Sequence, residues 1–121
     1  MGCDIHAWLE QKVDGKWVGV NELPDKGLTR NYERFRMLAG VRGNGPEPRG
    51  FPVDASDTVL LHFKRWACDA HSASWMSVEE ALPIFVETGI AKYPLEAFFG
   101  MDDEEDMANI RNSRIVFWFD N

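Results

Sequence analysis

The chain has little cysteine and histidine, no long apolar run and no excess of positive charge. Its 121 residues include only two cysteines and three histidines. No stretch approaches the roughly 20 apolar residues that a membrane-spanning helix needs. The first residues also lack the basic segment and apolar run of a secretory signal peptide. We therefore expect an intracellular protein with no membrane partner, in which the cysteines are free thiols.

The charge balance excludes one further class of partner. The formal net charge is −7, from 13 Lys and Arg against 20 Asp and Glu. Binding a long nucleic acid through its phosphates needs a basic face, so we expect no such partner. Between residues 30 and 66, seven basic residues stand against four acidic ones. Such a short Arg-rich stretch suits a small anion or an acidic partner surface.

One four-residue pattern occurs twice, as Cys3-Asp4-Ile5-His6 and as Cys68-Asp69-Ala70-His71. Both cysteines and two of the three histidines fall within it. Cys, Asp and His are among the commonest metal ligands in proteins. One interpretation is therefore a Cys2His2 zinc site, with one ligand pair from each copy.

The alternation of apolar and polar residues in the opening segment argues against that zinc site. A period of two is typical of a half-buried strand, in which positions three apart point to opposite faces. Cys3 and His6 could then not hold one ion, whereas Asp4 and His6 share a face. The same spacing returns at Asp69 and His71. We predict that these two carboxylates and two imidazoles together hold a divalent metal, zinc or manganese.

A simpler interpretation stays open for the same residues. Asp4 and His6 are then polar residues on the outer face of an edge strand. Asp69 and His71 cap a turn, and the two cysteines act as small buried hydrophobes.

Local signals predict an α+β protein of one domain, residues 1–121. Asp14-Gly15 is a strong hairpin turn between two strands. The run from Arg114 to Phe119 is typical of a central strand covered on both faces, and it would bring Asp120 near one Asp-x-His pair. We expect a small antiparallel sheet, made by the N-terminal hairpin and the C-terminal strand, with the helices packed on one face.

Capping residues mark the expected helices. Asn31 starts one that ends near Leu38, and Ser56 or Asp57 starts one that ends near Cys68. The Ser77-x-x-Glu80 capping box starts a third, running toward Thr88 with a kink at Pro83. Two more helices are expected at 94–99 and 107–111, and irregular loops at 43–54 and 69–74.

Several motifs resemble those of a family of small tailed-phage and prophage proteins. They are Met1-Gly2-Cys3-Asp4-Ile5-His6, Arg30-Asn31-Tyr32 with Phe35, Pro48-Arg49-Gly50, Asp69-x-His71-Ser72-x-Ser74-Trp75 and Phe117-Trp118-Phe119-Asp120-Asn121. The resemblance does not extend to Cys68, so the cysteine repeat is partly coincidence. It implies a phage origin and expression in the cytoplasm of a bacterial host cell, but no established activity.

One functional hypothesis is a metal-dependent nucleotide-binding protein or phosphoesterase. His71 or His6 would act as general acid or base, because imidazole titrates near neutrality. Arginines would clamp a phosphate and an aromatic ring would stack on the base. The predicted ligand-binding residues are Arg30, Arg49, Tyr32, Trp75, Ser72, Ser74 and Asp120. Pairing with a carboxylate is the commoner role of any single arginine.

The leading hypothesis is a binding protein without chemistry. It would be a phage accessory protein with a counter-defence role, which docks on a host defence or replication protein as anti-CRISPR inhibitors do. The acidic stretch Asp102, Asp103, Glu104, Glu105 and Asp106, with exposed tryptophans, would form the interface. The simpler interpretation of this stretch is a solvated helix N-terminus. A structural virion component fits less well, because the chain lacks repeats and coiled-coil heptads.

Overall fold

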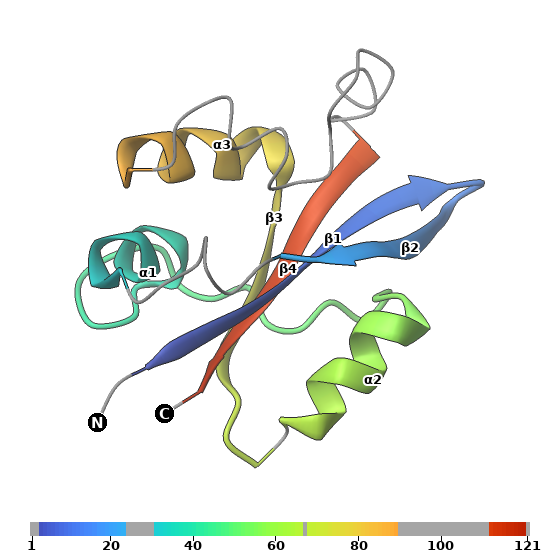
Figure 1. Ribbon diagram of the computed structural model, residues 1–121, viewed down its shortest axis with the longest axis horizontal. Helices are drawn as coiled ribbons and strands as arrows, with labels where there is room; N and C mark the ends of the chain where they lie inside the picture. Colours follow the sequence, from blue (N-terminus) through green and yellow to red (C-terminus); the bar gives the residue numbers. More distant parts are fainter. Residues whose placement is uncertain (1–2, 24–30, 67, 90–111, 121) are drawn as a thin grey trace.

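The computed structural model describes residues 3–23, 31–66, 68–89 and 112–120, which form one four-stranded antiparallel sheet and three helices (Figure 1). In chain order the elements are β1 (Asp4–Val13), β2 (Lys16–Glu22), α1 (Tyr32–Ala39), α2 (Asp57–Arg65), β3 (His71–Ser77), α3 (Val78–Glu87) and β4 (Ser113–Asp120). The strands lie in the order β2-β1-β4-β3, and every neighbouring pair is antiparallel. The predicted α+β class and antiparallel sheet are confirmed.

The central position of β4 follows from its apolar sequence. Every residue from Ser113 to Phe119 is buried, because β1 and β3 flank the strand and helices cover both of its faces. Successive side chains of a strand point to opposite faces. Ile115, Phe117 and Phe119 therefore belong to one core cluster and Val116 and Trp118 to another.

The helices lie on both faces of the sheet, not on one as predicted. Phe35 of α1 and Phe85 of α3 pack in the cluster that contains Phe117, and we call this side the α1/α3 face. Val59 of α2 packs with Trp118 on the opposite side, the α2 face. Figure 1 shows α2 apart from the other two helices, across the strands. A strand that is apolar on both sides needs cover on both.

Short-range signals gave the expected local structure. Asp14 and Gly15 have φ angles of 51° and 80°, as a two-residue hairpin turn of type I′ requires. The Asn31 side chain accepts a hydrogen bond from the backbone of Arg34, and both halves of the Ser77 capping box are present.

The strand β3 was not predicted, because most of its segment was expected to be a loop. Its sequence, His-Ser-Ala-Ser-Trp-Met-Ser, is largely polar and small. Pairing with β4 makes it a strand, with an irregularity between His71 and Ser74 and a left-handed φ of 54° at Ser72.

Some expectations lie outside the described residues. These are the helices at 94–99 and 107–111, the acidic stretch 102–106, and Arg30. None of the helices in the described part of the chain combines the length and the apolarity that crossing a membrane requires.

A cavity substitution tests whether α2 truly closes the second face. Trp118 is fully buried there. Trp118→Ala should lower the free energy of unfolding by about 3–5 kcal/mol, the usual cost of removing a buried aromatic ring. Denaturant titration measures this, with Val53→Ala on the surface as a control that should change it by less than about 0.5 kcal/mol. A loss below about 1 kcal/mol for Trp118→Ala would mean that this face is open to solvent.

Candidate functional site

The histidines of the two Asp-x-His pairs lie on opposite faces of the sheet. His6 is opposite Trp118 in the β1–β4 ladder, and its ring stacks on Trp66 at 4.2 Å between centroids. His71 is opposite Phe119 in the β3–β4 ladder. Trp118 and Phe119 are consecutive residues of one strand, and residues that face each other across a ladder share a face. The two histidines therefore point in opposite directions.

This arrangement does not assemble the predicted metal set of Asp4, His6, Asp69 and His71. No group of three or more His, Cys, Asp or Glu side chains in the described parts of the chain is placed to hold a metal ion. The Cys2His2 alternative is wrong for the same reason, since its two histidines also lie on opposite faces. That the protein binds zinc or manganese stays a prediction.

Each predicted catalytic histidine is bound within the fold. The Nε2 atom of His6 lies 2.5 Å from Oδ2 of Asp120, and both side chains are less than one-sixth exposed. The prediction that Asp120 approaches an Asp-x-His pair is therefore confirmed. On the other face, the ring of His71 lies 3.9 Å from Sγ of Cys3 and 3.0 Å from Oγ of Ser72.

Three predicted ligand residues, Arg49, Ser74 and Trp75, do come together. The Arg49 guanidinium donates to both carboxylate oxygens of Glu80 and to the backbone oxygen of Trp75, and it lies 4.8 Å from the centre of the Trp75 ring. Its backbone N–H donates to Oγ of Ser74. These contacts attach the loop 45–50 to β3 and α3. Arg49 is paired with a carboxylate, as the simpler interpretation of the arginines expected.

The Arg49–Glu80 contact has an electrostatic signature. The hydrogen bond from Arg49 holds the pKa of Glu80 at about 2, well below its ordinary value of 4.5, with further help from Ser77. Of the other predicted ligand residues, Tyr32 is exposed, and the guanidinium of Arg42 lies 4.9 Å from its ring centre.

Sequence reasoning missed a cluster of histidines and tryptophans on the α2 face, which we call the His–Trp cluster: His6, Trp8, His62, Trp66 and Trp118. The Nε1 atoms of Trp8 and Trp66 lie 2.6 and 3.3 Å from the two ring nitrogens of His62. A cavity of about 190 Å³ opens beside it, lined by Trp8, Glu22, Thr58, Leu61, His62 and Arg65. The helical spacing of Val59, His62 and Trp66 was the available signal, because it places all three on one side of α2.

A second missed group is a buried ion pair between neighbouring strands. Arg114 of β4 donates through Nε to Glu10 of β1 at 2.7 Å and through Nη1 to Asp54 at 3.1 Å. Its guanidinium lies 4.0 Å from the centre of the Trp17 ring. The second carboxylate oxygen of Glu10 accepts the backbone N–H of Ser56, the residue that caps α2. The pair thus joins the sheet to the start of α2.

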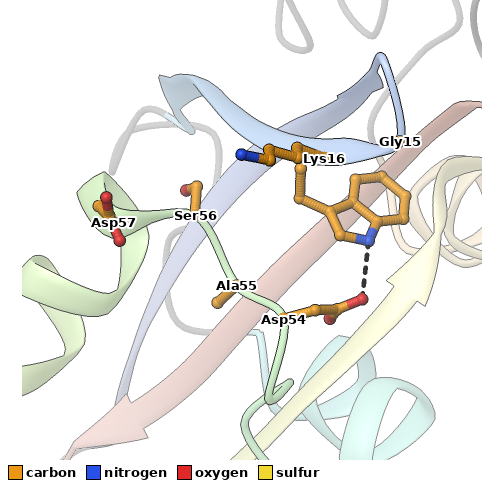
Figure 2. Close-up of a pocket in the computed structure, with 7 residues that line it drawn as sticks. Gly15, Lys16, Asp54, Ala55, Ser56 and Asp57 are labelled. Carbon is orange, nitrogen blue, oxygen red and sulfur yellow. Dashed lines mark hydrogen bonds between the residues drawn. The ribbon is translucent and has the colours of Figure 1, made fainter.

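Figure 2 shows the pocket between the hairpin turn and the start of α2. It has a volume of about 320 Å³ and is lined by Gly15, Lys16, Trp17, Asp54, Ala55, Ser56 and Asp57. The indole N–H of Trp17 donates to Asp54 at 3.1 Å, drawn as the dashed line. Asp54 is thereby engaged by both Trp17 and Arg114, and the volume is at the low end for a small-molecule site.

The structure thus defines a small α+β protein. In comparisons with known proteins, no family model matches the chain, no curated protein is similar to it and no solved structure matches it. These comparisons neither support nor contradict the resemblance to phage proteins. The functional argument therefore rests on this chain's own geometry.

The Arg49–Glu80 contact predicts a specific acid response. Because the folded-state pKa of Glu80 is depressed to about 2, its stabilisation is complete above the ordinary value and is lost as the pH falls from 4.5 toward 2. Glu80→Gln should therefore flatten the dependence of unfolding free energy on pH in this window, measured by urea titration. Glu47→Gln, an exposed loop variant, is the matched control. Equal slopes in wild type and Glu80→Gln would contradict the assignment.

A double-mutant comparison tests the buried pair. Glu10→Leu alone leaves the buried guanidinium of Arg114 paired with Asp54, whose side chain is 60% exposed, so the free energy of unfolding should fall by about 3 kcal/mol or more. Replacing both residues, Glu10→Leu with Arg114→Met, should cost less than the single change, because no uncompensated charge stays buried. Denaturant titration measures both. A double variant that is less stable than Glu10→Leu would show that the charge of Arg114 is satisfied without Glu10.

Proposed function

We propose that this protein is a phage accessory protein of the bacterial host cytoplasm that acts by binding a host defence or replication protein. The phage origin rests on the sequence resemblance. Binding, in place of catalysis, is favoured by two features of the described residues. Their histidines and Arg49 are engaged within the fold, and an apolar patch lies on the hairpin.

The hairpin patch carries the proposal. Val13, Val18 and Val20 are 50%, 45% and 45% exposed, and all three belong to the β1–β2 hairpin, which projects from the sheet in Figure 1. The β1–β4 ladder ends at Gln11, the residue opposite Val18. Beyond this point β1 and β2 continue as a two-stranded hairpin without β4 beside them. Val13 and Val18 are diagonal neighbours in the β1–β2 ladder, so their side chains share a face. Exposed apolar groups that lie side by side on a small protein are typical of interaction sites.

The charge of the chain indicates the chemistry of the partner. At a net charge of −7, association is fastest with a surface that carries basic groups around an apolar centre. The acidic stretch 102–106 is predicted to add to this attraction. The proposed partner is therefore a host protein with a basic, partly apolar surface.

The alternative of a metal-dependent nucleotide-binding protein or phosphoesterase lacks a comparable observation. Its two histidines lie on opposite faces of the sheet, and its Arg49 is paired with Glu80. We therefore favour protein binding over this alternative.

A matched pair of variants tests the hairpin patch. Val13→Thr/Val18→Thr/Val20→Thr keeps β-branched side chains in the strands but removes apolar contact area. Val53→Thr/Val86→Thr makes the same change at exposed positions elsewhere. Host proteins that co-purify with the tagged chain are identified by mass spectrometry, and the affinity of a purified partner is measured by calorimetry. The hairpin variant should bind at least about tenfold more weakly, which corresponds to roughly 1.4 kcal/mol, and the control should bind as wild type does.

Circular dichroism confirms that each variant is folded. Wild-type affinity in the hairpin variant, together with loss on charge reversal of residues 102–106, would move the interface to the acidic stretch. Wild-type affinity in both variants, or no stoichiometric partner, would contradict binding as proposed.

A further inference from the structure

His62 is held between two hydrogen-bond donors. Its Nδ1 lies 2.6 Å from the indole nitrogen of Trp8, and its Nε2 lies 3.3 Å from that of Trp66. A neutral imidazole has one acceptor nitrogen and one N–H group. Only one of the two indoles can therefore donate to the neutral ring. The shorter contact favours Trp8 as the donor and Nδ1 as the acceptor, in which case Nε2 carries the proton and does not accept from Trp66. A protonated ring would carry N–H groups on both nitrogens, so it could not accept from Trp8.

An alternative partner for the protonated ring is already in place. Oε1 of Glu22 lies 3.8 Å from Nδ1 of His62, which is beyond hydrogen-bond length but within the range of an ion pair. The Glu22 side chain is about half exposed, whereas that of His62 is 18% exposed. Both residues, with Trp8, line the cavity of about 190 Å³ between β2 and α2, and this space allows the side chains to rearrange.

We propose that His62 is a proton-operated switch on the α2 face. With His62 neutral, Nδ1 accepts the Trp8 indole N–H and fixes that ring between β1 and α2. When Nδ1 takes up a proton from solvent, its new N–H donates to the Glu22 carboxylate. The Trp8 indole loses its acceptor and turns toward the cavity. The switch exchanges one hydrogen bond for an ion pair and changes the shape of the cavity wall.

The charged groups around His62 allow this exchange. Glu22 of β2 favours the protonated ring, and Arg65 of α2, which lines the same cavity, opposes it. From β1, His6 lies 6.2 Å away between ring centroids, but it is bound to Asp120 of β4. The His6 ring therefore already has a carboxylate partner, whereas the Nδ1 atom of His62 faces the Trp8 indole N–H, a contact that its protonation breaks.

The direction of the pH effect follows from this difference. The Trp8 contact needs the neutral ring, so it is present at alkaline pH and is lost as the pH falls through the titration of the imidazole, which is near neutrality for an ordinary histidine. The exchange needs no unfolding of the chain, because Trp8 and Glu22, the partners of Nδ1 in the two states, both line the cavity.

The indole N–H resonances test the switch directly. Five tryptophans give up to five such peaks in a ¹⁵N-labelled sample, and Trp8→Phe identifies the peak of Trp8. Between pH 8 and pH 5 this peak should shift along a single titration curve. In His62→Gln the side-chain oxygen can still accept from Trp8 but does not titrate, so the peak should stay constant. His71→Gln, on the opposite face, should titrate as wild type does.

Glu22→Gln gives a second test that does not disturb the buried residues. Removal of this carboxylate should lower the midpoint of the Trp8 curve, because the protonated ring loses its partner. A Trp8 peak that does not move between pH 8 and pH 5, or that titrates alike in wild type and His62→Gln, would overturn the proposal. So would a midpoint that is unchanged in Glu22→Gln.

Discussion

The burial of β4 on both faces is the constraint on which the rest of the structure depends. Because Phe117 and Trp118 point to opposite sides, the sheet carries two separate cores, one against α1 and α3 and one against α2. Because consecutive β4 residues face opposite sides, the residues paired with them, His6 with Trp118 and His71 with Phe119, also lie on opposite faces. This alternation therefore builds the His–Trp cluster around His6 and keeps His71 out of it.

Polar residues are used mainly to fasten elements together. Arg114 and Glu10 join the two central strands to the start of α2, and Arg49 and Glu80 join a loop to α3. A side chain that already holds an opposite charge is a poor site for a substrate, since a ligand would have to displace that partner. In the described residues, these charged side chains therefore serve to hold strands, loops and helices together.

Signals confined to a few neighbouring residues could be read before folding. The Asp14-Gly15 turn and the caps at Asn31 and Ser77 depend on contacts at most three residues apart, and all of them formed as predicted. The polar strand β3 could not be predicted in this way, because its order comes from a partner about forty residues later in the chain. The fold class was therefore accessible from the sequence, and the layering of the helices was not.

The candidate site divides along the same line. By itself, the sequence determined the half-buried character of β1 and the central position of β4, because alternation and apolar content act within a strand. Only the tertiary structure decided which histidines meet. His6 joins His62, which lies in no repeat, and His71 joins Cys3. The physical reason is that the direction of a side chain depends on the strand register, which the pairing of distant segments fixes.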